Sequence, residues 1–248
     1  MKTLSGKTLE EIAIERLTAF ESPEGYWVAY SGGKDSDVIL DLVRRSGCKY
    51  DAHHSLTTAD PPEVVRHIKE QTDVEIHRPK RTMWELIKYN KMPPRRNARY
   101  CCTTQKESGG SGRIVVTGIR RAESVQRSNR KMVEACYRDM TKRYLNIIID
   151  WTTTDVWQYI RSRNIKYCSL YDEGFKRIGC ILCPMNREVE RQMQRWPKLC
   201  RAWERAVKAT FNPDKTGFAN AEEYWQWWLN RDGKMKPSDV DGWLFKNG

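Results

Sequence analysis

Short apolar runs alternate with stretches of helical periodicity through the first two thirds of the chain. Leu9, Ile12, Ala13 and Leu17 recur at helical spacing, which predicts an amphipathic helix at the start. Apolar runs bounded by polar and glycine-rich segments predict strands at 26–30, 50–56, 74–79, 113–118 and 144–150. The segments between them predict helices at 35–47, 60–71, 82–90 and 152–164.

This alternation predicts the fold class. Several strand candidates are too apolar to have one exposed face, which indicates a mainly parallel sheet covered on both sides. We therefore expect a doubly wound α/β fold. The sequence predicts an N-terminal helix over residues 1–22, an α/β domain over 23–185 and a helical C-terminal appendage over 186–248.

The appendage is rich in Trp and Arg. The segment YWQWWLN (224–230) places Tyr224, Trp227 and Trp228 near one helix face and Trp225 off it. Aromatic rings beside basic residues can stack on bases. Packing of these rings against the rest of the protein is the alternative that the pattern favours.

Charge adds information about partners. The 248 residues include 44 Lys+Arg and 32 Asp+Glu, a net charge of +12. This balance favours nucleotides, nucleic acid or anionic surfaces, although a solvated basic surface explains it equally well. The N-terminal segment does not resemble a signal peptide, and no apolar stretch is long enough to span a membrane. We expect a cytoplasmic protein whose eight cysteines are mostly reduced, so that clustered cysteines indicate a metal.

The loop SGGKDS (31–36) lies between a predicted strand and a predicted helix. Backbone N–H groups at such a helix start lack partners and attract anions, and Gly32 and Gly33 allow close approach. Ser31 and Ser36 offer hydroxyls, Lys34 adds a positive charge, and Asp35 either orients the loop or binds Mg²⁺. The Walker and dinucleotide glycine spacings are absent. The order of residues nevertheless predicts a phosphate loop rather than a structural turn.

Two cysteine pairs form the second candidate site. Cys101 and Cys102 are adjacent, and Cys180 and Cys183 follow the C-x-x-C spacing. Four thiolates suit a tetrahedral zinc ion or a [4Fe–4S] cluster. Neighbouring side chains diverge, so the adjacent pair favours the larger cluster, while zinc and plain buried cysteines remain alternatives. Cys48, Cys136, Cys168 and Cys200 are isolated and are expected to be small buried residues.

These motifs together resemble a known family. SGGKDS after an apolar strand is similar to the pyrophosphate (PP) loop of the ATP pyrophosphatase superfamily. The CC…CxxC pattern resembles the iron–sulfur members of the phosphoadenosine phosphosulfate (PAPS)/adenylylsulfate reductase-like family, and the resemblance extends through segments 115–127, 150–160 and 170–184. It implies an adenine nucleotide alpha-hydrolase-like, Rossmann-like fold and a nucleotide-binding domain over 23–185.

The resemblance also implies roles for individual residues. Lysine is found near the cluster in the resembling reductases, as Lys106 is here. Surface charge is the alternative for each arginine. The candidate catalytic residues are Lys34, Asp35, Arg120 and Arg127. The candidate nucleotide-binding residues are Ser31, Gly32, Gly33, Lys34, Asp35, Ser36, Gly118, Arg120 and Arg121. The candidate cluster ligands are Cys101, Cys102, Cys180 and Cys183.

The match departs from the reductases at two places. Those enzymes use a cysteine near the C-terminus as the nucleophile toward sulfur, whereas this sequence ends without one and Cys200 is its last cysteine. Segment 56–64 matches the adenosine segment of the reductases only in part. The sequence therefore favours an enzyme of adenylyl activation and sulfur transfer, which resembles the DNA phosphorothioation protein and the tRNA thiolases.

The expected cofactors and partners follow from this hypothesis. They are a [4Fe–4S] cluster, ATP or adenylyl sulfate, Mg²⁺ as an open alternative, a nucleic-acid substrate and a sulfur donor protein. Two other functions remain open. One is a thioredoxin-dependent sulfonucleotide reductase, and the other is a non-catalytic module that senses an adenine nucleotide.

Overall fold

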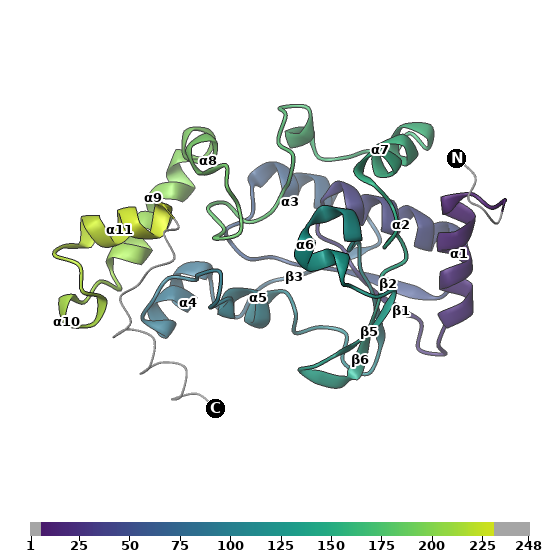
Figure 1. Ribbon diagram of the computed structural model, residues 1–248, viewed down its shortest axis with the longest axis horizontal. Helices are drawn as coiled ribbons and strands as arrows, with labels where there is room; N and C mark the ends of the chain where they lie inside the picture. The colour runs from purple at the N-terminus through teal and green to yellow at the C-terminus, as the bar shows by residue number, and fades with distance from the viewer. Residues whose placement is uncertain (1–5, 231–248) are drawn as a thin grey trace. The chain divides into compact units, whose positions relative to one another are not determined.

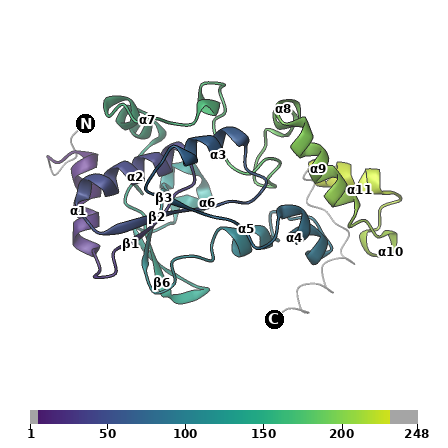
Figure 2. The same ribbon diagram turned by 180° about the vertical axis from the view of Figure 1, so that it is seen from behind.

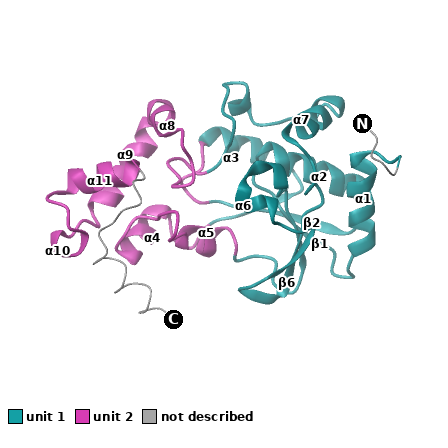
Figure 3. Ribbon diagram, in the orientation of Figure 1, with its two compact units in different colours: residues 1–56, 62–78, 108–179 teal, residues 57–61, 79–107, 180–248 magenta. Residues whose placement is uncertain are grey.

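The computed structural model describes residues 6–230, and they divide into two compact units (Figure 3). Unit 1 contains the described residues up to 56, together with 62–78 and 108–179. Unit 2 contains residues 57–61 and 79–107 and the described residues from 180 onward. Both units are therefore assembled from segments that are far apart in the sequence.

Unit 1 is built on a six-stranded sheet with the strand order β3-β2-β1-β4-β6-β5 (Figure 1). All neighbouring strands are parallel except β5 and β6, which form an antiparallel pair at one edge. The strands are β1 (Tyr26–Ala29), β2 (Tyr50–Ser55), β3 (Val74–His77), β4 (Ile114–Val116), β5 (Val133–Cys136) and β6 (Asp139–Leu145).

The helices of unit 1 lie mainly along one face of this sheet (Figures 1 and 2). Helix α2 packs against α1 and α7. The phenol of Tyr26 on β1 donates to the carbonyl of Leu17 on α1. The face of the sheet that carries the Tyr26 side chain therefore packs against α1. The unit 1 helices are α1 (Leu9–Phe20), α2 (Lys34–Ser46), α3 (Pro62–Lys69), α6 (Val125–Ser128), α7 (Thr153–Ser162) and the short 3₁₀ turns η1 (Arg121–Glu123) and η2 (Ser169–Tyr171).

Unit 2 is helical in its described residues. Helix α9 packs against α4, α8 and α11, and Trp203 on α9 is almost fully buried. The Trp203 ring meets Trp84 edge-on at 5.3 Å and stacks on Trp228 at 5.0 Å. The Trp228 indole donates to the carbonyl of Pro94 at 2.8 Å. The helices are α4 (Met83–Asn90), α5 (Tyr100–Gln105), α8 (Val189–Arg195), α9 (Pro197–Lys208), α10 (Pro213–Thr216) and α11 (Ala221–Asn230).

The predicted mainly parallel α/β fold is confirmed, two local predictions need correction, and one strand was missed. The last parallel strand is β6, Asp139–Leu145, not 144–150, because Ile147–Ile149 are apolar residues of a buried turn. The antiparallel strand β5 was not predicted. Trp225 is as deeply buried as Tyr224 and Trp228, so the helical pattern placed it wrongly, whereas the preference for packed aromatics is confirmed. The described residues include no helix long and apolar enough to cross a membrane.

Candidate nucleotide site and cysteine quartet

The loop 30–33 and the loop 117–120 start at the carboxyl ends of two neighbouring strands of the sheet. They follow β1 and β4, which are parallel neighbours. From β1 the chain continues toward β2 and β3 on one side, whereas β4 and β6 lie on the other side. This is a topological switch point, and open α/β sheets bind ligands at the carboxyl ends of their strands there.

The loop 31–36 is wound tightly around Ser36. The Ser36 hydroxyl accepts from the Gly33 N–H at 3.0 Å and donates to the Gly33 carbonyl at 2.7 Å. The Ser31 hydroxyl donates to Ser36 at 3.1 Å. Gly32 has a φ of 73°, and a Cβ there would lie 2.7 Å from the Ile68 side chain. The backbone conformation and the close approach of α3 both require glycine at position 32.

A buried hydrogen-bonded group of Tyr30, Asp37 and His67 supports this loop. The Tyr30 hydroxyl donates to Asp37 at 2.5 Å, and His67 Nε2 also contacts that carboxylate oxygen at 2.9 Å. Burial raises the pKa of Asp37, and the hydrogen bond from His67 opposes this rise. Asp37 follows the loop on α2 and His67 lies on α3, so this group fixes the start of α2 against α3.

Asp35 is held by two cations. Its Oδ1 accepts from Arg120 Nε at 2.7 Å, and its Oδ2 accepts from Lys34 Nζ at 3.0 Å. The Arg120 side chain is almost fully buried and also donates to the Trp151 carbonyl at 3.2 Å. A Cβ at Gly118 would lie 3.1 Å from the Asp35 backbone, so the β4 loop passes close to α2. Arg120 therefore positions Asp35 and joins the two loops.

A cavity of about 870 Å³ opens beside these loops. Most of the predicted nucleotide-site residues line it, whereas Gly32 and Arg121 are not among the lining residues. Arg121 instead pairs with Asp150 at 2.5 Å on the surface. The cavity is cationic, with six Lys or Arg side chains and three carboxylates in its wall. The predicted residues in the wall are Ser31, Gly33, Lys34, Asp35, Ser36, Gly118, Arg120 and Arg127.

Arg127 is the second predicted arginine in the cavity wall. It is half-buried and pairs with Glu123. Burial, together with the positive charges of Arg177 and Arg130, lowers the pKa of Arg127 to about 10. A bound anion would relieve this crowding of like charges, because opposite charges nearby favour the ionised form.

The sequence prediction missed several lining residues. Arg161, Lys176 and Arg177 add three exposed cations, although the last two belong to a segment that carried the family resemblance. Tyr171 was also missed, and its hydroxyl accepts from the Lys34 N–H at 3.0 Å. Trp157 meets Tyr171 edge-on at 5.2 Å and Tyr167 at the same centroid distance. The lining of the cavity thus includes several cationic side chains and an aromatic wall formed by Trp157, Tyr167 and Tyr171.

Both cysteine pairs lie in unit 2. Cys101 and Cys102 form the first turn of α5, and Cys180 and Cys183 lie in a turn that precedes α8. That turn is anchored, because the Ile181 N–H donates to the Ala59 carbonyl at 2.8 Å and the buried Leu182 N–H donates to Gln192 at 2.7 Å. The Cys183 N–H donates to the Cys180 carbonyl at 3.2 Å, which curls the C-x-x-C segment into a turn.

The four thiols lie close enough to alter one another's ionisation. A hydrogen bond with Cys102, then burial, raise the pKa of Cys101, and charges at Cys180 and Cys183 raise it further. The same hydrogen bond lowers the pKa of Cys102, helped by Arg99, whose guanidinium lies 3.4 Å from the Cys102 sulfur. A charge at Cys180 raises the pKa of Lys106. The quartet therefore combines four thiols with two compensating cations.

The quartet offers the ligands that a metal group needs. Four cysteine thiols suit a tetrahedral zinc ion or a [4Fe–4S] cluster. The side chains of Arg99 and Lys106 beside them would offset the negative charge of the thiolates.

The other four cysteines are buried, as predicted. Cys48, Cys136 and Cys168 lie in unit 1, and Cys200 lies on α9 of unit 2. The Cys200 thiol donates to the Gln192 carbonyl at 3.6 Å, and burial raises its pKa to about 11. A thiol with this pKa is protonated near neutral pH and is a poor nucleophile.

The sheet order, the loop 31–36 and the cationic cavity define a nucleotide-binding protein of the α/β class. A sequence model of the phosphoadenosine phosphosulfate reductase domain matches residues 25–186, which is more than half of the chain. The chain therefore belongs to this family. The predicted family and Rossmann-like fold are confirmed.

Individual relatives agree with this assignment. An adenosine 5′-phosphosulfate reductase of Staphylococcus epidermidis is 30% identical over 167 residues, which cover 62% of this chain and 68% of the relative. A protein of Methanocaldococcus jannaschii described as uncharacterized is 29% identical over 202 residues, or 73% of this chain and 41% of the relative. A second protein of the same organism is also described as uncharacterized, and the match covers 51% of it. The chain therefore spans about half the length of these two relatives.

A solved structure has the same fold. The phosphoadenylyl-sulfate (PAPS) reductase from Candida auris, crystallised as a phosphate complex, matches with a TM-score of 0.52 and 19% identity. The match covers 72% of this chain and 90% of that chain.

Proposed function

We propose that this chain is an enzyme that binds ATP in the cavity of unit 1 and transfers the adenylyl group to an acceptor, which a sulfur donor then attacks. The observation that carries the proposal is the cavity itself. It contains the loop that starts α2, six cationic side chains and only three carboxylates. A polyphosphate matches this excess of positive charge, and the dipole at the start of α2 also favours an anion.

The proposed reaction has two displacements. An acceptor oxygen attacks the α-phosphorus of ATP, the bond to pyrophosphate breaks, and pyrophosphate leaves with the electron pair. A sulfur nucleophile then displaces AMP from the acceptor. The Lys34 side chain holds the leaving pyrophosphate, and Arg127 and Arg177 neutralise charge that develops around phosphorus. The adenine ring lies against the aromatic wall formed by Trp157 and Tyr171.

Asp35 acts by orientation in this proposal. Both of its oxygens are already paired, one with Arg120 and one with Lys34. A Mg²⁺ ion would have to compete with two cations for this carboxylate. Asp35 therefore holds Lys34 and the β4 loop in place, and Mg²⁺ takes no part in the proposed reaction.

The quartet Cys101, Cys102, Cys180 and Cys183 holds a [4Fe–4S] cluster in this proposal. Support comes from the four thiols, which affect one another's ionisation, and from the two neighbouring cations. When bound, such a cluster supplies an iron that can carry sulfur and a cross-link between α5 and the turn before α8. Arg99 and Lys106 offset the negative charge of the thiolates.

A sulfonucleotide reductase is the second candidate, because relatives of this chain bear the name adenosine 5′-phosphosulfate reductase. A thiolate would attack the sulfur of the sulfonucleotide, release the nucleotide and pass sulfite on after reduction by thioredoxin. Cys200 does not suit the role of this thiolate. Cys200 is buried on a helix, and its raised pKa keeps it protonated.

The nature of the acceptor follows from charge. The net charge of +12 favours an acceptor that is itself an anion, and we propose a nucleic acid. Binding of duplex DNA or transfer RNA should then weaken steeply as salt rises, because each phosphate contact releases counterions. If the affinities for duplex DNA and for transfer RNA both stay unchanged as salt rises, the acceptor is not a nucleic acid.

One set of assays separates these functions. Labelled ATP with a DNA or transfer RNA acceptor and a sulfide source should yield AMP and pyrophosphate. Adenylyl sulfate or its 3′-phosphorylated form with thioredoxin should yield no sulfite. If the unaltered chain instead releases sulfite and the Cys200→Ser variant does not, the protein is a sulfonucleotide reductase. Tight ATP binding with no product in any assay would identify a nucleotide-sensing module.

A further inference from the structure

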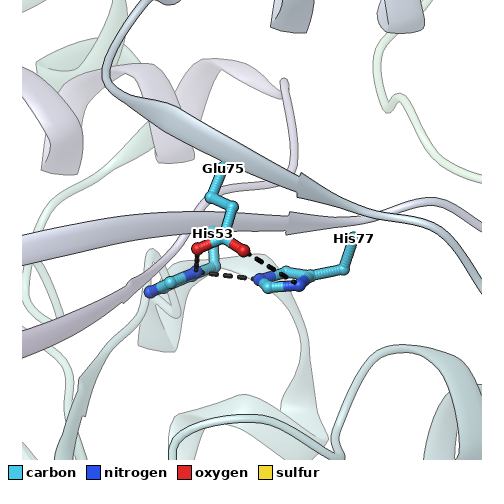
Figure 4. Close-up of side chains that lie close together, drawn as sticks. All are labelled: His53, Glu75 and His77. Carbon is cyan, nitrogen blue, oxygen red and sulfur yellow. Dashed lines mark hydrogen bonds and ion pairs between the residues drawn. The ribbon is translucent and has the colours of Figure 1, made fainter.

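A second cluster of polar side chains lies on the sheet of unit 1, apart from the cavity. His53 on β2 and Glu75 and His77 on β3 project from the same face of the two strands (Figure 4). The strand register pairs His53 with Glu75 and Ser55 with His77, which explains why these residues share a face. None of the three lines the cationic cavity.

The nitrogen and oxygen atoms of this cluster converge on one point. His53 Nδ1 lies 2.8 Å from His77 Nε2. One Glu75 oxygen lies 3.4 Å from His53 Nδ1, and the other lies 3.7 Å from His77 Nδ1. One donor atom from each residue fits within 4.8 Å of the others. His53 is buried, whereas Glu75 is exposed, so the cluster is open to solvent on one side.

The neighbours of His53 fix which of its nitrogens carries the proton. Its Nε2 contacts the Asp51 carboxylate, which can only accept a hydrogen bond when it is ionised. Arg113 Nη1 donates to Asp51 at 2.7 Å. Nε2 of His53 therefore carries the proton, and the free lone pair of Nδ1 points toward His77.

The ring of Trp27 fixes the orientation of both imidazoles. It stacks on His53 with a centroid distance of 3.4 Å and an interplanar angle of 13°. It lies 5.9 Å from His77 at an angle of 14°. A carboxylate on the far nitrogen and a packed ring are the usual supports of a metal-binding histidine. The two observations are independent of the spacing of the three donors.

We propose that His53 Nδ1, His77 Nε2 and one Glu75 oxygen bind a divalent first-row transition metal ion of the zinc type. Two imidazoles and one carboxylate are a donor set that such ions accept, and a solvent molecule completes the coordination. Metal–nitrogen bonds of about 2.0–2.1 Å place the two nitrogens about 3.3 Å apart, so the rings need to separate by about 0.5 Å. His77 loses the proton on Nε2 and takes one up on Nδ1, so no net proton is released.

The test is a zinc titration of the full, anaerobically prepared chain against a chromophoric zinc chelator. We expect the unaltered chain to bind one zinc ion at this cluster and the His77→Gln variant not to bind it. Glu75→Gln should weaken zinc binding at least about tenfold. Asp51→Asn, which frees His53 without removing a ligand, should weaken it about 10–100-fold, as is typical of residues that support a metal ligand. Glu70→Gln changes an exposed carboxylate elsewhere on the chain and should leave zinc affinity unchanged.

Zinc can also bind thiolates, so a second measurement separates the cysteine quartet from this cluster. Cobalt(II) difference spectra should show weak visible bands without intense sulfur-to-metal absorption, and His77→Gln should abolish them. Far-ultraviolet circular dichroism checks that each variant folds. Zinc that binds equally well in His77→Gln and Glu75→Gln, or no zinc bound at micromolar concentration in the unaltered chain, would overturn the proposal.

Discussion

The guanidinium of Arg120 and the carboxylate of Asp35 connect the β4 loop to the first turn of α2 through a hydrogen bond of 2.7 Å. Arg120 is buried and Asp35 is mostly so. The same carboxylate accepts a hydrogen bond from Lys34, which belongs to the loop 31–36. One buried ion pair thus sets the distance between the two loops that border the cavity.

Replacement of Arg120 by Met should therefore destabilise the chain. Removing one partner of a buried ion pair leaves the other without compensation, and we expect a loss of about 3 kcal/mol in the free energy of unfolding. Urea unfolding measures this loss. Arg121→Met is the matched control, because Arg121 pairs with Asp150 at the surface and such pairs contribute about 0–1 kcal/mol. Equal losses in the two variants would contradict the assigned role of Arg120.

Two adjacent glycines should respond differently to substitution. Gly32→Ala should destabilise the chain by about 1–3 kcal/mol, because the new Cβ meets Ile68 and the backbone has a positive φ. At Gly33 a Cβ meets nothing closer than the Tyr171 hydroxyl at 3.4 Å. Gly33→Val should therefore keep the stability of the chain and weaken ATP binding at least about tenfold, by filling the space where a phosphate approaches the loop.

Calorimetric titration with ATP and urea unfolding of both variants check this pair. The unaltered chain is the reference for each measurement. ATP affinity that survives in Gly33→Val would show that the loop is only a turn.

The cysteine quartet predicts a coloured protein. Anaerobically purified chain should be brown and contain about four irons, as measured by iron and sulfide analysis. Cys180→Ser should lose the iron, because this buried cysteine belongs to the quartet. Cys200→Ser is the control and should retain it. Stoichiometric zinc in place of iron would contradict the cluster.

Cys200 predicts a pH dependence. Burial raises its pKa to about 11 from an ordinary value of 9.0, so the folded chain keeps this proton at a pH where the unfolded chain releases it. The stability contributed by the buried neutral thiol is complete below about pH 9 and should decline as the pH rises toward about 11. The difference in unfolding free energy between the unaltered chain and Cys200→Ala, measured from pH 8 to 11, isolates this effect. A pH-independent difference would refute it.

Local motifs explain why much of the fold was predictable from the sequence. The loop 31–36 is a contiguous segment whose glycines and serines meet their partners within a few residues. By contrast, Ile147–Ile149 form a buried turn, and an apolar run alone does not distinguish a turn from a strand. The weak alternation of β5 gave no strand signal.

The candidate site was predicted less completely, because its outer wall depends on tertiary structure. Arg121 and Arg127 lie in one motif, but Arg121, the first residue of the turn η1, pairs with Asp150, while Arg127 on α6 borders the cavity. Arg161 comes from the end of α7 and carries no local signal. His53 and His77 come together only because β2 and β3 are neighbours in register.

The division of the chain into interleaved segments limits how the gene can be shortened. The chain passes between the two units five times, after residues 56, 61, 78, 107 and 179. A stop codon after residue 185 leaves every strand of the sheet in the product but removes Trp203, which packs against Trp84 on α4, and Trp228, which stacks on Trp203. Such a product would expose an apolar helix in its middle, so a fragment designed to isolate the nucleotide-binding half should aggregate unless segment 79–107 is redesigned as well.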